Sequence, residues 1–200
     1  TLVDGVTPKE RSWILALDKR YDGQRETPRD PLDRAWADAL ADMVDAYPDD
    51  MTVASVYAEA LMNTMPWDYW GPSGEAKPDT QAVIKSLERV MAAEPEHPLA
   101  LHLYIHALEA SSNAQKAEGA ADALANLVPG SGHLVHMPSH IYFGVAGIRT
   151  RSSPIFALPI LMKLILPNAM SKASILRCIT PTTFTFYGPQ QPCKVRVNCR

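Results

Sequence analysis

No acidic residue follows Asp122, although the 200-residue chain contains 22 of them. Residues 144–200 therefore carry only basic charges. Residues 1–143 contain 11 basic residues and all of the acidic ones, which gives them a net charge of −11. Because a surface that binds nucleic acid is basic, this composition does not suggest nucleic acid as a partner of residues 1–143, and we expect none. It also sets the last part of the chain apart from the rest.

Cysteine is missing from residues 1–143 as well, so this part offers no thiol nucleophile and its cysteine usage indicates no redox compartment. The three cysteines of the chain all come later, at Cys178, Cys193 and Cys199. The zinc-protease motif H-E-x-x-H is also missing, because Leu103 and Met137 occupy the position of its glutamate. No catalytic residue can be named from a motif.

Long apolar runs are absent too. The most apolar segment, residues 155–166, is short and contains Pro159 and Lys163, so it is not expected to span a bilayer. No secretory signal is visible at the start of the chain. We therefore expect no membrane partner and a cytoplasmic location. Since Thr1 is not an initiator methionine, we also expect the chain to be a piece of a longer one.

A period of 34 residues is present. His102 and His106 lie four positions apart, and His136 and His140 repeat this pair 34 positions later. Two prolines, at positions 95 and 129, follow the same period. This is the length of one tetratricopeptide helix–turn–helix unit. The period predicts an all-α fold in which antiparallel helix pairs stack as a helical-repeat array, an α-solenoid.

Apolar residues at spacings of three and four predict seven helices in residues 1–143. Asp30, Asp79 and Asn113 are predicted to cap the second, fourth and sixth of them. Pro138 is expected to distort the seventh helix locally. The expected helices are 11–21, 31–46, 51–62, one beginning after Asp79, 98–110, one between Asn113 and Pro129, and 133–143.

Residues 66–78, "PWDYWGPSGEAKP", interrupt the period and read as a loop inserted between two helices of one repeat. Trp67, Tyr69 and Trp70 have two interpretations. They cover helix ends as a small satellite core, or they form a lid that faces a ligand, because inserted loops often carry function.

The strings "HLYIHALEAS" and "PGSGHLVHMPSHIY" resemble a group of bacterial tetratricopeptide-repeat proteins of largely unassigned function. The resemblance extends from Val6 to Phe143, and it implies a helical-repeat domain over residues 1–143. In such superhelices, fixed positions of the first helix of each repeat line a concave groove. Aligned on the prolines, these positions include Glu59, His102, His106, Glu109, His133, His136 and His140.

Helix geometry independently places these histidines on one face, because residues i, i+4 and i+7 lie together. Imidazoles beside Glu59 and Glu109 can bind a protein, a peptide or a small polar ligand, and two histidines at i, i+4 can reach one metal ion. The competing interpretation is a structural network, in which the histidines hold adjacent helices through hydrogen bonds to Tyr104, Tyr142 or carbonyl groups. The sequence thus predicts a binding scaffold with no cofactor. A metal-dependent or hydrolytic enzyme in the same groove is the alternative.

Residues 144–200 differ from the resembled group, which continues after "HMPSHIY" with a glycine-tyrosine pair and another amphipathic helix. Back-translation in a shifted frame makes residues 180–188 compatible with "PHNIHFLW", a segment of the resembled group. It makes residues 162–165 compatible with "DEAY", which would restore acidic residues to the tail. We therefore expect a frameshift near residues 144–147 and a poorly packed tail. A genuine basic, acid-free tail is the alternative.

Overall fold

The computed structural model describes residues 4–24, 26–145, 184–187 and 192–195. The chain divides into two compact units, residues 1–112 and residues 113–200. Among the described residues between 4 and 145 the regular structure is helical, and the only strand-like pairing is a single bridge between Trp70 and Ala76. The all-α prediction is therefore confirmed for this part of the chain.

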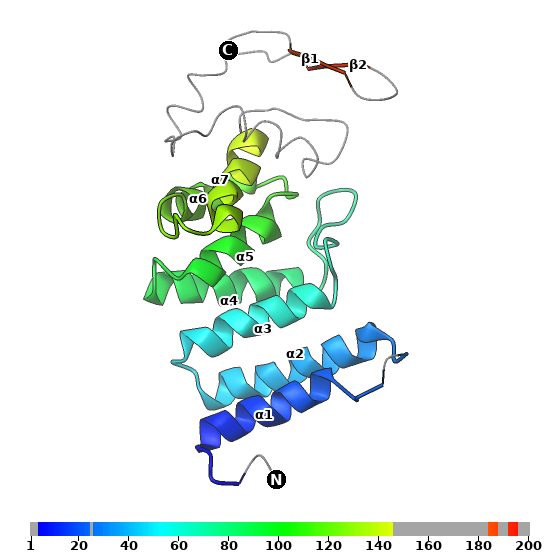
Figure 1. Cartoon of the computed structure of the whole chain (residues 1–200), viewed down its shortest axis with the longest axis vertical. Helices are drawn as coiled ribbons and strands as arrows, with labels where there is room; N and C mark the ends of the chain where they lie inside the picture. Colours follow the sequence, from blue (N-terminus) through cyan, green and yellow to red (C-terminus); the bar gives the residue numbers. More distant parts are fainter. Residues whose placement is uncertain (1–3, 25, 146–183, 188–191, 196–200) are drawn as a thin grey trace. The chain divides into compact units, whose positions relative to one another are not determined.

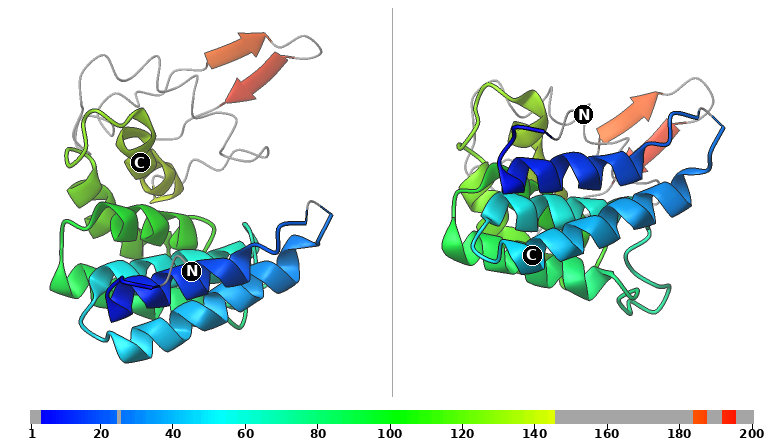
Figure 2. Two further views of the ribbon diagram at one scale, coloured as in Figure 1. Left: turned by 60° about the horizontal axis from the view of Figure 1, so that its bottom comes forward. Right: turned by 90° about the horizontal axis from the view of Figure 1, so that it is seen from below.

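Among its described residues the first unit contains five helices. Each packs against the next along the chain, as Figures 1 and 2 show from several directions. Its fully buried side chains include Leu40, Val53, Leu87 and Ile105, one from each of α2 to α5. Within α2 and α4 the large buried residues recur at spacings of three and four, so each of these two helices buries one stripe, whereas α3 and α5 are buried on more than one side. The helices are α1 (Pro8–Arg20), α2 (Arg29–Ala46), α3 (Met51–Asn63), α4 (Thr80–Ala93) and α5 (Pro98–Leu108).

Aromatic contacts join α1 to α2. The rings of Trp13 and Trp36 lie 6.4 Å apart between centroids, and the Arg20 guanidinium lies 5.8 Å from the centre of the Trp36 ring. Trp36 is buried at this contact. Leu15 and Leu17 of α1 stay exposed, and Ala16 is the only buried residue of this helix.

Helix beginnings agree only in part with the predicted caps. Asp50 caps α3 by accepting a hydrogen bond from the Val53 amide at 3.0 Å. The prediction that Asp30 caps α2 is wrong, because α2 begins at Arg29 and Asp30 lies in its first turn. Asp79 and Asn113 do occupy the residues before α4 and the 3₁₀ helix η1, but neither side chain makes a capping hydrogen bond.

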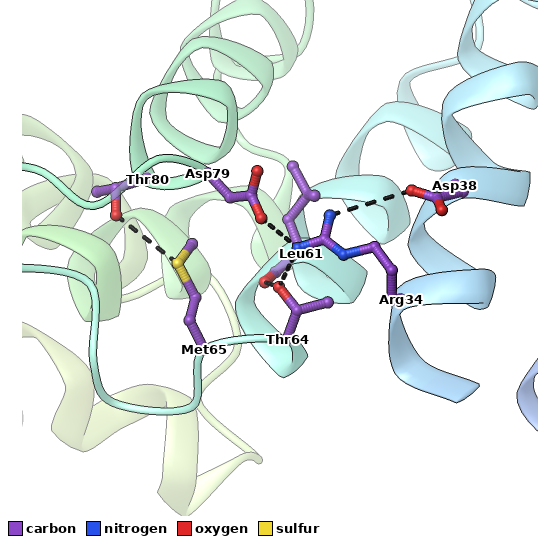
Figure 3. A network of polar contacts seen from close by, with 7 residues as sticks. All are labelled: Arg34, Asp38, Leu61, Thr64, Met65, Asp79 and Thr80. Atoms are coloured by element: carbon purple, nitrogen blue, oxygen red, sulfur yellow. Dashed lines mark hydrogen bonds and ion pairs between the residues drawn. The ribbon is translucent and has the colours of Figure 1, made fainter. Parts of the chain in front are cut away.

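The Asp79 carboxylate has another partner, which explains the missing cap. Arg34 of α2 donates to Asp79 and, at 3.2 Å, to the Thr64 hydroxyl at the end of α3 (Figure 3). A second carboxylate, Asp38, lies 4.0 Å from the same guanidinium. One arginine therefore links α2 to the residues that flank the inserted loop.

The second unit contains η1 (Ala114–Ala117), α6 (Glu118–Leu124) and α7 (Gly132–Val145) among its described residues. Both η1 and α6 pack against α7, where Met137 and Ile141 are fully buried. Helix α7 continues through Pro138. The single sixth helix expected from the sequence is instead a 3₁₀ turn followed by a short α-helix that ends at Leu124.

Further along, β1 (Phe184–Tyr187) and β2 (Pro192–Val195) pair as an antiparallel hairpin. Part of the predicted frameshift region and most of the tail, residues 146–183, 188–191 and 196–200, lie outside the described residues. The boundary at residues 143 and 144 thus stays a prediction. Among the described helices, none combines the length and apolar character needed to cross a bilayer.

Candidate functional site

Helix α5 carries the first histidine pair. Pro98 begins the helix, and the preceding His97 caps it by accepting a hydrogen bond from the Ala100 amide at 3.2 Å. His102 and His106 then lie one turn apart, and their ring centroids are 4.7 Å from each other. Both side chains are half-buried. The predicted i, i+4 juxtaposition is therefore present within the first unit.

Glu109 completes a polar pair with His106. The His106 Nδ1 atom donates to Glu109 Oε1 at 2.9 Å, and only 11% and 13% of the two side chains are exposed. A hydrogen bond at Nδ1 fixes the ring orientation and gives Nε2 the lone pair of the neutral imidazole. His106 is thus oriented by a carboxylate, as ligand-binding and metal-binding histidines commonly are.

The inserted loop lies against the end of α5. The Trp70 indole donates from Nε1 to the Ala107 carbonyl at 2.7 Å. Tyr69 is buried, and its own carbonyl accepts from the hydroxyl of Thr80 at 2.6 Å. Tyr69 and Trp70 therefore behave as the predicted satellite core, which covers helix ends and anchors the loop.

Trp67 behaves differently from the other two aromatics. Its side chain is 64% exposed, and the edge-to-face contact between its ring and the His106 ring spans 5.0 Å between centroids. Its backbone has a φ of +60°, in the left-handed region that a bulky residue rarely adopts. Such strain costs about 1–3 kcal/mol and is found most often at binding sites. Trp67 is the candidate for the ligand-facing part of the loop.

Tyr69 links the loop to Glu109 electrostatically. Burial raises the pKa of the Tyr69 phenol, and the nearby Glu109 carboxylate raises it further. Together with the contacts above, this brings five side chains into one group, which we call the Trp67 cluster. Its members are Trp67, Tyr69, His102, His106 and Glu109.

Glu59 is the remaining predicted site residue of the first unit. It lies half-buried on α3, a helix that contacts α5 within this unit. In the proline alignment it occupies the position of His106 one repeat earlier. A direct contact between Glu59 and the Trp67 cluster stays a prediction.

The second unit repeats the histidine arrangement on α7. The rings of His133 and His136 lie 4.8 Å apart between centroids, and those of His136 and His140 lie 5.2 Å apart. His133 is exposed, His136 is half-buried and His140 is buried. The predicted common groove for the histidines of both units stays a prediction.

The structural-network interpretation named two tyrosines as histidine partners, and the structure gives both of them other acceptors. Tyr104 donates to Glu88 at 2.9 Å within the first unit, and Tyr142 donates to Asp122 at 2.5 Å within the second. Sequence reasoning missed these pairs. Glu88 and Asp122 are 34 residues apart, but their tyrosine partners are 38 apart, so the period by itself does not reveal the pairs.

Comparisons with known proteins add no relative: no protein-family model, curated protein or solved structure matches the chain. The candidate site is therefore argued only from the positions and contacts of its residues. Within the first unit, two pairs of side chains bring potential metal-ligating atoms within 4.8 Å of each other: His102 with His106, and His106 with Glu109.

Proposed function

We propose that this protein is a tetratricopeptide-like helical-repeat scaffold that binds a peptide or a small polar ligand at the Trp67 cluster. The observation that carries the proposal is Trp67, an exposed indole held in a strained backbone conformation against an oriented imidazole. Strain of this kind persists only when the surrounding structure maintains it. Here the anchored residues Tyr69 and Trp70 maintain it.

The chemistry of the cluster suits a ligand that is polar and has a flat or aliphatic part. An exposed indole offers a large apolar face with little side-chain entropy to lose. His102 adds an imidazole that can donate or accept, and Glu109 contributes negative charge beside His106. Peptide backbones offer the matching donors and acceptors, next to side chains that can pack on Trp67.

Replacing Trp67 with glycine tests the proposal. The change relieves the left-handed strain, worth about 1–2 kcal/mol for a residue with a side chain, and removes a ring that is mostly exposed. We expect Trp67→Gly to leave the free energy of unfolding unchanged or higher, while binding of a mixed tetrapeptide library is lost. Urea denaturation and ¹H–¹⁵N NMR titration of the full chain measure the two effects.

His106→Ala separates the binding role from the structural-network interpretation. If His106 contacts the ligand, this variant weakens peptide binding with little change in melting temperature. A lower melting temperature with unchanged peptide binding contradicts the proposal. His97→Asn is the matched control, because asparagine retains the helix cap that His97 provides and His97 lies outside the Trp67 cluster.

A metal-dependent or hydrolytic enzyme is the second candidate. The observation that favours it is the hydrogen bond between His106 and Glu109, because an imidazole oriented by a carboxylate is also the arrangement of a general base. Hydrolysis of a chromogenic ester or peptide by the full chain, lost in His106→Ala, would favour this candidate over the scaffold.

A further inference from the structure

We propose that His102 and His106 form a binding site for a divalent transition-metal ion of the zinc type, with Glu109 as the residue that positions His106. The proposal uses side chains of the Trp67 cluster, but it does not depend on the proposed function, because metal binding needs no peptide ligand.

Spacing along α5 provides the first part of the argument. Residues i and i+4 of a helix lie one above the other on the same face. The ligand atoms of His102 and His106 lie within 4.8 Å of each other. Two nitrogens bound to one tetrahedral zinc ion are roughly 3.3 Å apart, given Zn–N bonds of about 2.0–2.1 Å. Small side-chain rotations therefore bring the pair to a chelating distance.

Glu109 provides the second part. A histidine that binds a metal usually donates its other ring N–H to a carboxylate or carbonyl, which fixes the tautomer and raises the basicity of the ligating nitrogen. His106 has this arrangement, with Nδ1 donating to Glu109 at 2.9 Å. Nε2 is then the atom that carries the lone pair for the metal.

Charge and surroundings provide the third part. Glu109 supplies one negative charge beside a dication, and both members of the His106–Glu109 pair are largely shielded from solvent. Partial burial strengthens such an attraction relative to bulk water. Two protein nitrogens leave further coordination positions of a tetrahedral ion to water or to a ligand.

A residue-specific NMR experiment on the full chain tests the proposal. Long-range ¹H–¹⁵N spectra of the histidine rings are recorded during titration with Zn²⁺. We expect the Nε2 signal of His106 and one ring nitrogen of His102 to shift with a common saturation curve, while His97 stays unchanged. The signals of the three histidines on α7 are read separately. Zn²⁺-independent signals from His102 and His106, or metal binding at His106 Nδ1, would overturn the proposal.

Glu109→Gln tests the positioning role. We expect the Zn²⁺ affinity to fall by about 10- to 100-fold, the usual effect of removing a carboxylate behind a metal-binding histidine. The apo spectrum should also show that His106 no longer has a single tautomer, and a merely structural role of Glu109 would not lower the Zn²⁺ affinity together with this change. Unchanged affinity and an unchanged tautomer would contradict the assignment, and His97→Asn serves as the unaffected control.

The two proposals fail in distinguishable ways. Loss of the Zn²⁺ response in His102→Ala, with peptide binding retained, supports the metal site alone. A chain that binds Zn²⁺ at His106 but binds no tetrapeptide keeps this inference and removes the proposed function. A chain that binds peptide and leaves both imidazoles unchanged in Zn²⁺ does the reverse.

Discussion

Single hydrogen bonds between tyrosine and carboxylate join successive helices in each unit. Tyr104 donates to Glu88, and burial together with this bond raises the pKa of the Tyr104 phenol well above its usual value of 10.0. Tyr142 is raised in the same way by burial and by Asp122. Since both phenols must stay protonated to donate, these bonds make folding sensitive to alkaline pH.

The resulting prediction concerns stability above pH 10. The native pKa of Tyr104 exceeds the unfolded one, so its contribution is complete below pH 10 and is lost as the pH rises beyond it. Tyr104→Phe should cost about 1 kcal/mol at pH 8 and should flatten the decline in stability between pH 10 and 11. Urea denaturation of both proteins at pH 8, 10 and 11 measures this, and parallel declines would contradict it.

At the scale of single residues, the sequence predicted which residues belong to the site better than it predicted their conformations. The 34-residue period identified His102 and His106, because helix geometry alone brings i and i+4 together. It did not identify the left-handed backbone of Trp67, since that conformation is imposed by the loop on both sides of the residue. Nor did it separate exposed Trp67 from buried Tyr69, because neither lies in a periodic segment.

At the scale of the helices, Asp50 before α3 and Asp79 before α4 occupy equivalent positions but interact differently. Asp50 accepts from the Val53 amide and also pairs with Lys9. Burial opposes its ionised form, but these two partners outweigh it and lower the pKa of Asp50. Asp79 makes no capping bond and pairs with Arg34, whose side chain is 45% exposed.

We therefore expect unequal effects of alanine at these two positions. Asp50→Ala should lower the free energy of unfolding by about 1 kcal/mol, because an orphan amide at the start of α3 loses its acceptor. Asp79→Ala should cost well under 1 kcal/mol, as is usual for exposed ion pairs. The lowered pKa of Asp50 means that its contribution is present above about pH 4 and is lost as the pH falls further. Equal costs at pH 7, measured by urea denaturation, would contradict this comparison.

Helix boundaries were predictable where an apolar stripe and a strong start signal coincide. Proline marked the start of α5, which begins at Pro98 as expected, whereas α1 begins at Pro8, three residues before its expected start. The segment after Asn113 has few large apolar residues, so its periodicity does not determine a helix length. In the structure only Leu124 among its larger side chains is fully buried, and the segment splits into η1 and α6.

For the whole molecule, the helical period was sufficient to predict an all-α body and the insertion at residues 66–78. It was not sufficient to predict the division of the chain at residues 112 and 113. A sequence repeat describes equivalent units, whereas the boundary between compact units depends on how many contacts cross each connection. That quantity is set by side-chain packing between distant segments, which no local spacing encodes.

The two units should also differ in local stability. Helix α3 has 13 residues with seven of them buried, whereas α6 has seven residues with three buried and follows a four-residue 3₁₀ turn. Short helices are marginal by themselves and depend on packing, and local opening is easiest where little apolar surface is buried. In native-state hydrogen exchange of the full chain, we therefore expect amides of η1 and α6 to exchange at least tenfold faster than those in the middle of α3. A tenfold difference corresponds to roughly 1.4 kcal/mol of local stability. Residues near each helix start exchange quickly in any case and serve as the internal reference. Protection in α6 equal to that in α3 would show that α6 opens only with global unfolding, and would overturn the prediction.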